Sequence, residues 1–153
     1  MQDGQTLIIE INMQQTNKIP ASGAMPRPLN HEDGYAQLAA NLLPWNRNPI
    51  TITFKTDEFT SICPTTGQPD FSEIEIKYCP KEWYIESKAM KFYLWAFREH
   101  GAHCEKLADM IATEIRDATS CTWVQVTVSQ KPRGGLSVQA VSRLMKKPSE
   151  KKT

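Results

Sequence analysis

The sequence predicts an α+β fold in which strands and helices follow the order ββααββ. Two pairs of segments alternate between apolar and polar residues, as strands do when one face is buried and the other is solvated. Two helical segments separate these pairs, and one of them is strongly amphipathic. Strand pairs with helices between them favour a four-stranded antiparallel sheet that carries two helices on one face.

The strands are recognised by their alternation, and we expect four of them, at residues 49–56, 72–78, 124–128 and 136–140. In the second strand, Ile74, Ile76 and Tyr78 occupy one face and charged residues occupy the other. The segment 129–135 contains a proline and two adjacent glycines, so it predicts a hairpin loop between the last two strands.

The two helices are predicted at residues 88–99 and 102–118. The first is apolar nearly all round, which indicates burial on several sides and favours contact with another subunit. The second repeats apolar residues at the i, i+3, i+4 spacing of one buried helix face. An open four-stranded sheet leaves two unpaired edges, so we also expect homo-oligomerisation into a larger barrel.

Residues 1–48 contain scattered prolines and glycines, and we interpret them as a partly irregular N-terminal arm. Within it we expect a short helix at 35–43 and an edge strand at 8–11. Residues 49–142 form the predicted folded domain. Residues 143–153 are rich in lysine and are expected to form a basic, disordered tail.

Composition narrows the class of protein. The 153 residues, of which 40% are hydrophobic, suit a single domain with one core. A formal net charge of +1 argues against direct binding of nucleic acid. The sequence has neither a signal-peptide pattern nor an apolar run of the roughly 18 residues that cross a membrane. Its four cysteines form no C-x-x-C pair, so we expect free thiols and a cytoplasmic protein.

The segment 59–71 carries the residues best suited to chemistry. It is predicted to be a loop, because two prolines, a glycine and several hydroxyl residues lie between two strands. It contains Cys63 and, seven residues later, Asp70. One interpretation is a connector with a buried cysteine and a turn-capping aspartate. The other is a nucleophile with an acid or base beside it.

Four segments of the sequence resemble the single-module 7-cyano-7-deazaguanine reductases, which are nitrile reductases of the tunnelling fold. They are TSICPTTGQPDF, IESKAMKFYL, AFREHG and KPRGGLS, at residues 60–71, 85–94, 96–101 and 131–137. The resemblance implies that residues 49–142 are a tunnelling-fold catalytic domain. It implies reduction of a nitrile to a primary amine with NADPH, on the queuosine pathway. It also implies a homo-oligomer with active sites at subunit interfaces.

The same resemblance assigns the site residues. Cys63 matches the nucleophile that forms a covalent thioimide, and Asp70 matches the proton donor. The residues matched to substrate binding are Ile85, Glu86, Ser87, Cys104 and Glu105. Those matched to the phosphates of NADPH are Lys88, Lys91 and Arg133. No metal site is implied. The family usually has a histidine immediately before the glutamate at 105, whereas this chain has Cys104 there.

Three alternative functions remain open. The first is a thioimide-forming amidinotransferase of the archaeosine type, which uses ammonia where the reductases use hydride. The second is a deazaguanine-binding module without turnover, because the histidine has become Cys104. The third is a zinc-dependent enzyme of the pterin type, with His100, His103 and Cys104 as ligands, although their spacing is irregular for such a site.

Overall fold

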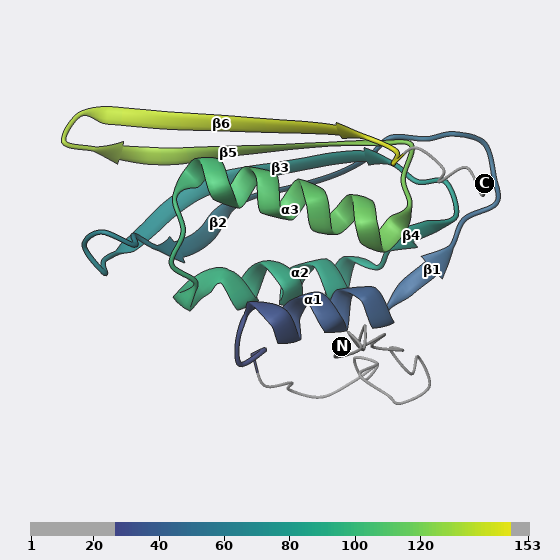
Figure 1. The fold of residues 1–153 in the computed structure, drawn as a ribbon, viewed down its shortest axis with the longest axis horizontal. Coiled ribbons are helices and arrows are strands. Elements are labelled where there is room, and N and C mark those ends of the chain that lie inside the picture. The colour runs from purple at the N-terminus through teal and green to yellow at the C-terminus, as the bar shows by residue number, and fades with distance from the viewer. Residues whose placement is uncertain (1–26, 148–153) are drawn as a thin grey trace, which may run out of the picture.

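The computed structural model describes residues 27–147, and it has the predicted α+β architecture. Strands β2, β3, β5 and β6 form one antiparallel sheet in that order, and α2 and α3 lie on the same side of it (Figure 1). The elements are α1 (His31–Ala40), β1 (Leu42–Pro44), β2 (Ile52–Ile62), β3 (Pro69–Cys79), β4 (Trp83–Ile85), α2 (Ser87–Trp95), the 3-10 helix η1 (Ala96–Glu99), α3 (Cys104–Thr119), β5 (Trp123–Arg133) and β6 (Leu136–Met145). No helix within residues 27–147 is long and apolar enough to span a membrane.

The core lies between the sheet and the helices, where the predicted alternation places it. Every second side chain of β3 and β5 is buried, among them Ile76 and Val126. The face of α3 that meets them is formed by Leu107, Ala108, Ile111, Ala112 and Ile115. Full burial of one large aliphatic side chain stabilises a fold by about 1.5–3 kcal/mol, so this interface holds α3 against the sheet.

The strands are longer than predicted, and the loops are correspondingly shorter. Strands β2 and β3 pair as far as Ile62 and Pro69, which leaves residues 63–68 as a tight turn where a 13-residue loop was expected. Strand β5 likewise extends to Arg133 and leaves Gly134 and Gly135 in the turn, both with positive φ. In both hairpins the hydrogen-bonded pairing of the strands extends into residues whose composition is typical of turns. Proline does not prevent this, because it is tolerated at strand ends and at irregular positions.

Helix α2 is packed on both sides within the chain. It lies between α1 and β2, and its last turn continues as η1, so the predicted helix at 88–99 is confirmed with a change of helix type. Part of the apolar surface that the sequence assigns to another subunit is therefore covered by α1. Trp95 remains partly exposed beside it.

The segment 27–48 is structured, unlike most of the irregular arm expected there. Helix α1 begins four residues earlier than predicted, because the Asn30 side chain caps it by accepting a hydrogen bond from the Asp33 N–H at 2.8 Å. Strand β1 pairs with β4 in a second, two-stranded sheet that the sequence analysis missed. The expected boundary at 142 falls inside β6. The strand at 8–11 and the end of the tail lie outside the described residues.

Gly34 sets how closely α1 approaches α2 and η1. A Cβ atom added at Gly34 would overlap the Cβ of Ala96. We therefore expect Gly34→Ala to lower the free energy of unfolding by about 1–3 kcal/mol through overpacking. This loss would exceed the helix-propensity gain of about 1 kcal/mol. Chemical denaturation measures it, with Ala36→Gly on the exposed face as the control for propensity. A Gly34→Ala protein more stable than the wild type would contradict this packing.

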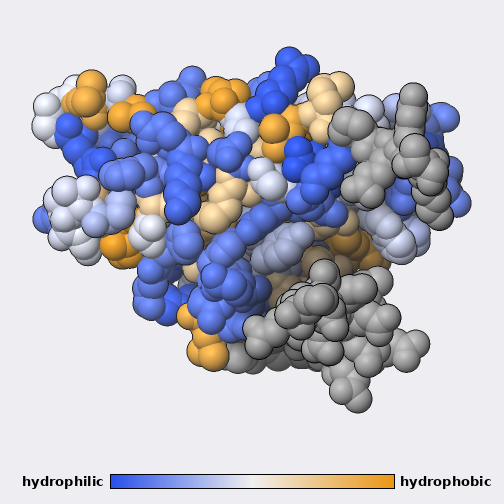
Figure 2. Space-filling view, in the orientation of Figure 1, coloured by the Kyte–Doolittle hydropathy of each residue, from blue (hydrophilic) through white to orange (hydrophobic). Residues whose placement is uncertain are grey.

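Among the described residues, the outer edge of β6 pairs with no further strand, and that of β2 makes only the bridge between Ile62 and Gly101. Exposed apolar side chains on β6 include Leu136, Val141 and Met145. Figure 2 shows hydrophobic groups among hydrophilic ones along the side of the molecule that β6 occupies in Figure 1. Exposed apolar side chains on an unpaired edge favour pairing with another strand.

Candidate active site

Four chain segments meet at one end of the sheet. They are the turn at 63–68, the start of β3, the end of β5 and the start of α3 (Figure 1). Ile62 joins the first segment to the last, because its N–H donates to the His100 carbonyl at 3.0 Å and its carbonyl accepts from Ala102 N–H at 3.2 Å. The residue before Cys63 is thereby fixed to the link that precedes α3.

Cys63 lies at the start of a turn that its own backbone closes. Its N–H donates to the Gln68 carbonyl at 2.8 Å, and its carbonyl accepts from the Gly67 N–H at 2.9 Å. Gly67 has a φ of 71°, which glycine adopts without strain. The Cys63 side chain is buried, with 5% of the residue surface exposed. The turn therefore holds a thiol in a fixed position at the end of β2.

The surroundings of Cys63 favour its ionised form. The hydroxyl of Thr66 is the largest influence, followed by the backbone N–H groups of Thr66 and Thr65 and by the Arg133 side chain, and together they lower the pKa of Cys63 to about 6. A free cysteine has a pKa near 8.5. Cys63 is therefore mostly thiolate at neutral pH, which is the nucleophilic form.

Asp70 lies at the start of β3 and is 4% exposed. Its Oδ1 accepts a hydrogen bond from Arg133 Nη1 at 2.7 Å, and Arg133 Nη2 donates to Gln130 Oε1 at 3.0 Å. The structure thus brings Cys63 and Asp70 to the same end of the sheet. It also places Arg133, which the resemblance matches to the cofactor, in contact with Asp70, and the Arg133 side chain contributes to lowering the pKa of Cys63.

Cys104 and Glu105 form the first turn of α3 at this same end. Cys104 is buried, its thiol donates to the Val128 carbonyl at 3.3 Å, and burial raises its pKa. It is therefore a weakly ionised thiol, in contrast to Cys63. Glu105 is exposed to solvent and free to meet a ligand. His103 is exposed at the N-cap and makes no capping hydrogen bond with its side chain.

Ile85, Glu86 and Ser87 lie elsewhere, at the N-terminus of α2. The Ile85 N–H donates to the Tyr78 hydroxyl at 2.9 Å. Glu86 caps α2: its Oε2 accepts from the N–H of Lys88 at 2.9 Å and its Oε1 accepts from the Ser87 hydroxyl at 3.2 Å. Burial acts to raise the pKa of Glu86, but these hydrogen bonds outweigh it and the pKa is lowered. Glu86 is therefore a carboxylate with a structural role in this chain.

The two groups of predicted site residues are far apart within one chain. Tyr78, which contacts Ile85, lies eight residues along β3 from Asp70. At about 3.3 Å per residue, this separation is roughly 26 Å. One chain therefore brings together Cys63, Asp70, Cys104, Glu105 and Arg133, but it does not bring Ile85, Glu86 or Ser87 to them.

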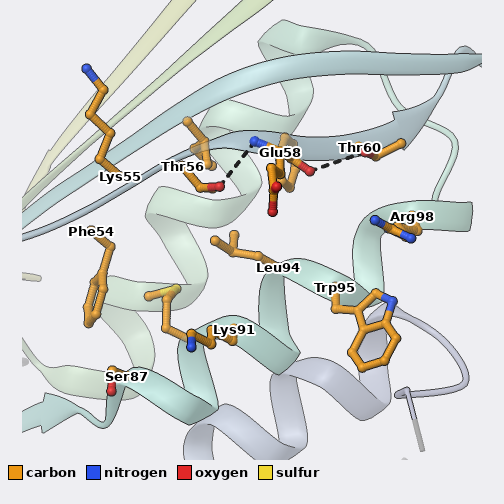
Figure 3. Close-up of a pocket in the computed structure, with 13 residues that line it drawn as sticks. Phe54, Lys55, Thr56, Glu58, Thr60, Ser87, Lys91, Leu94, Trp95 and Arg98 are labelled. Carbon is orange, nitrogen blue, oxygen red and sulfur yellow. Dashed lines mark hydrogen bonds between the residues drawn. The ribbon is translucent and has the colours of Figure 1, made fainter.

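A groove of about 630 Å³ lies between β2 and α2 (Figure 3). Lys91 lines it from α2, Lys55 lines it from β2, and Arg98 lines it from η1. Glu58 is the one acidic residue among those that line it. Phe54, Leu94 and Trp95 supply apolar surface. The groove therefore combines cations with flat apolar surface, which suits an anionic ligand that carries rings.

Sequence reasoning missed several residues of these two regions. Thr66 lowers the pKa of Cys63, Gln130 accepts a hydrogen bond from Arg133, and Lys55 and Arg98 line the groove. The signal for Thr66 was present, because a hydroxyl three residues after a cysteine in a turn can reach back to it. No group of three or more His, Cys, Asp or Glu residues that could hold a metal occurs between residues 27 and 147.

Comparisons with known proteins give the family. The family model described as QueF-like protein matches residues 69–149. The NADPH-dependent 7-cyano-7-deazaguanine reductase of Hyphomonas neptunium is 46% identical over 85 residues, which are 56% of this chain and 55% of that protein. The Brucella ovis protein of the same name is 38% identical over 111 residues, which are 72% of this chain and 70% of that protein.

A solved structure supports the fold. The archaeosine synthase QueF-Like in its apo form superposes with a TM-score of 0.59 at 24% identity, over 63% of this chain and 95% of that one. At this identity the likeness concerns the fold alone. The matched segment of this chain spans about half the length of the Hyphomonas relative and more than two thirds of the Brucella one. From the family model and these relatives, the chain belongs to the QueF-like protein family.

Proposed function

We propose that this protein reduces the nitrile of 7-cyano-7-deazaguanine to the primary amine of 7-aminomethyl-7-deazaguanine with NADPH, in the queuosine pathway. The observation that carries the proposal is the buried Cys63 side chain at the same end of the sheet as Asp70, in surroundings that lower the pKa of Cys63 to about 6. The names of the Hyphomonas and Brucella relatives support the same reaction. Its partners are then small molecules rather than nucleic acid, and its four free cysteines suit the cytoplasm.

The chemistry follows from the electrophile. A nitrile carbon is weakly electrophilic, and a thiolate is the protein nucleophile best suited to it. When Cys63 adds, a carbon–sulfur bond forms and one π bond of the nitrile breaks. Asp70, having taken up the proton of the Cys63 thiol, gives it to the freed electron pair at nitrogen, which yields a thioimide. NADPH, when bound, supplies hydride for the reduction to the amine. Burial of Cys63 and Asp70 protects the thioimide from water.

The substrate would be held by residues of two chains. Glu105 stands at the reactive end and can accept the adjacent N–H groups of the deazaguanine ring. Ile85, Glu86 and Ser87 lie near Tyr78, whose backbone is roughly 26 Å along β3 from that of Asp70, so we expect them to reach a substrate at Cys63 only from another subunit. The outer edges of β2 and β6 support a homo-oligomeric barrel that would bring the two groups together.

Complementation between subunits tests this arrangement. Cys63→Ala and Glu86→Gln proteins should each be inactive, and oligomers reassembled from an equal mixture should recover about a quarter of the wild-type sites, because random pairing restores one intact combination in four. A mixture of Cys63→Ala with Asp70→Asn is the control, since both residues lie at the same end of one chain, and we expect no recovery from it. Equal recovery from both mixtures would contradict a site made by two chains.

The groove between β2 and α2 suits the phosphates of NADPH. Lys91 faces it, Lys88 lies one turn earlier on α2, and Lys55 and Arg98 add positive charge against the single acid Glu58. Cations on two elements can contact a pyrophosphate and a further phosphate together. We therefore place the cofactor phosphates along α2, with Lys88 and Lys91 among their contacts.

An amidinotransferase of the archaeosine type is the second candidate, because the superposed archaeosine synthase QueF-Like shares the fold. Sequential incubation separates the two activities. We expect a covalent adduct with 7-cyano-7-deazaguanine and then oxidation of added NADPH. An adduct that consumes ammonia but leaves NADPH unchanged would favour the amidine-forming reaction. An adduct that neither reagent consumes would favour a binding module, and failure to form an adduct would contradict both enzymes.

A further inference from the structure

The resemblance matches Arg133 to the phosphates of NADPH, but this role does not explain the contacts that Arg133 makes in the structure. Its guanidinium donates from Nη1 to Asp70 Oδ1 at 2.7 Å and from Nη2 to Gln130 Oε1 at 3.0 Å. The Arg133 side chain also contributes to lowering the pKa of Cys63, which lies at the same end of the sheet. One cation is thus paired with Asp70 and favours the ionised form of Cys63.

The fold directs Arg133 to this place. Strands β3 and β5 pair Ser72 with Gln130, which sets Gln130 close to the start of β3. The ladder between β5 and β6 is irregular between Gln130 and Arg133, where Pro132 has no N–H to donate. Gly134 and Gly135 then reverse the chain with φ values of 56° and 81°. These features hold the last side chain of β5 against the active-site end of the sheet.

Arg133 and the two residues that accept its hydrogen bonds differ in their exposure to solvent. Asp70 and Gln130 are buried, whereas the Arg133 side chain is 52% exposed. The guanidinium therefore reaches inward from the surface to acceptors fixed by the sheet. Gln130 holds the guanidinium plane, because its amide oxygen takes up one of the two Nη groups. Cys63 and Asp70 lie at the same end of the sheet, and a guanidinium there stabilises negative charge on either side chain.

We propose that Arg133 is a positioning residue for the half-reaction that precedes hydride transfer, in which it holds the Cys63 thiolate and the Asp70 carboxyl in place for attack on the nitrile. This proposal rests on the proposed function, because it concerns the same nucleophile and acid. It differs from the role implied by the family resemblance, in which Arg133 contacts cofactor phosphate. A positioning role requires Arg133 before NADPH binds, whereas a phosphate contact does not.

The rate of Cys63 alkylation tests the proposal without substrate or cofactor. Iodoacetamide is applied to the full-length protein between pH 5 and 9, and labelling at Cys63 is followed by peptide mass spectrometry. In the wild type we expect the rate to rise with pH, with a midpoint at about pH 6. In Arg133→Ala the midpoint should rise, because a cation beside the thiolate is lost. One unit of rise lowers the thiolate fraction near pH 6 by about 5-fold.

Three further variants keep the result interpretable. Arg133→Lys retains the charge but loses the planar fork, so its alkylation profile should lie between those of the wild type and Arg133→Ala. Gln130→Leu leaves the arginine in place but removes the acceptor that orients it, and we expect a smaller upward shift. Lys131→Ala removes an exposed cation from the same hairpin and should leave the profile unchanged.

Thioimide formation without NADPH supplies the second measurement. We expect Arg133→Ala to slow the appearance of the 7-cyano-7-deazaguanine adduct at pH 6 at least as much as it slows alkylation. Wild-type rates of both alkylation and adduct formation in Arg133→Ala, together with a raised KM for NADPH, would overturn the proposal. If the alkylation profile shifts as expected but the wild type forms no nitrile adduct, the proposed function fails while the effect of Arg133 on the thiolate stands.

Discussion

Cys63→Ala should abolish the covalent adduct with 7-cyano-7-deazaguanine and all NADPH oxidation, while the protein keeps its fold. Cys63 is the one cysteine in the described residues whose pKa is lowered, whereas burial raises the pKa of Cys104 and Cys121. The loss of a small side chain in a turn removes little packed surface, so stability should change little. Intact-mass spectrometry of the protein after incubation with the nitrile measures the adduct.

Cys79→Ala is the matched control for this experiment. Cys79 is buried at the opposite end of β3 from Asp70, so its removal should leave the adduct intact. The pH profile adds a second check: adduct formation should rise as pH increases through about 6, because the lowered pKa converts thiol to thiolate there. An adduct of full yield on the Cys63→Ala protein would show that another residue is the nucleophile.

Asp70→Asn should reduce turnover by about 10²- to 10⁴-fold, the usual contribution of a positioned acid or base. The asparagine side chain has nearly the same volume and can still accept from Arg133 through its oxygen, so the local structure should persist. Substrate affinity should change far less than turnover, since the substitution removes a proton donor and not a binding surface. Steady-state kinetics and equilibrium titration with the nitrile separate the two effects.

A structural explanation of the same loss has to be excluded. Asp70→Ala removes both the proton donor and the acceptor for Arg133, so it should shift the alkylation profile of Cys63 as well as lower turnover. Asp70→Asn should lower turnover with a smaller change in that profile. Turnover of Asp70→Asn within a few-fold of the wild type would remove Asp70 from the mechanism.

The sequence predicted the sheet and α3 because their patterns are periodic over many residues. Ile74, Ile76 and Tyr78 are buried as their alternation indicates, and Leu107, Ile111 and Ile115 form the expected helix face. The pairing of β1 with β4 was missed because each strand has three residues, too few for a period to be recognised. The ends of β2 and β3 were missed because their local composition is typical of turns.

The candidate site was predictable in part. Cys63 and Asp70 were expected to act together, and the structure places them at one end of the sheet. That Arg133 pairs with Asp70 depends on the register of β5 against β3 and on an irregularity at Pro132, which no local sequence pattern encodes. Likewise, the separation of Glu86 from Cys63 depends on the length of β3, because Ile85 contacts Tyr78 near the far end of that strand. A sequence motif identifies the residues of a site, but it does not show which subunit supplies each of them.

The stoichiometry of the reaction tests the central claim most directly. A nitrile becomes a primary amine by gaining four electrons, and each NADPH supplies two of them. The wild-type protein should therefore oxidise two molecules of NADPH for each 7-aminomethyl-7-deazaguanine formed, as measured by absorbance and by mass spectrometry of the product. Consumption of 7-cyano-7-deazaguanine without oxidation of NADPH, or with a product other than the amine, would contradict the account.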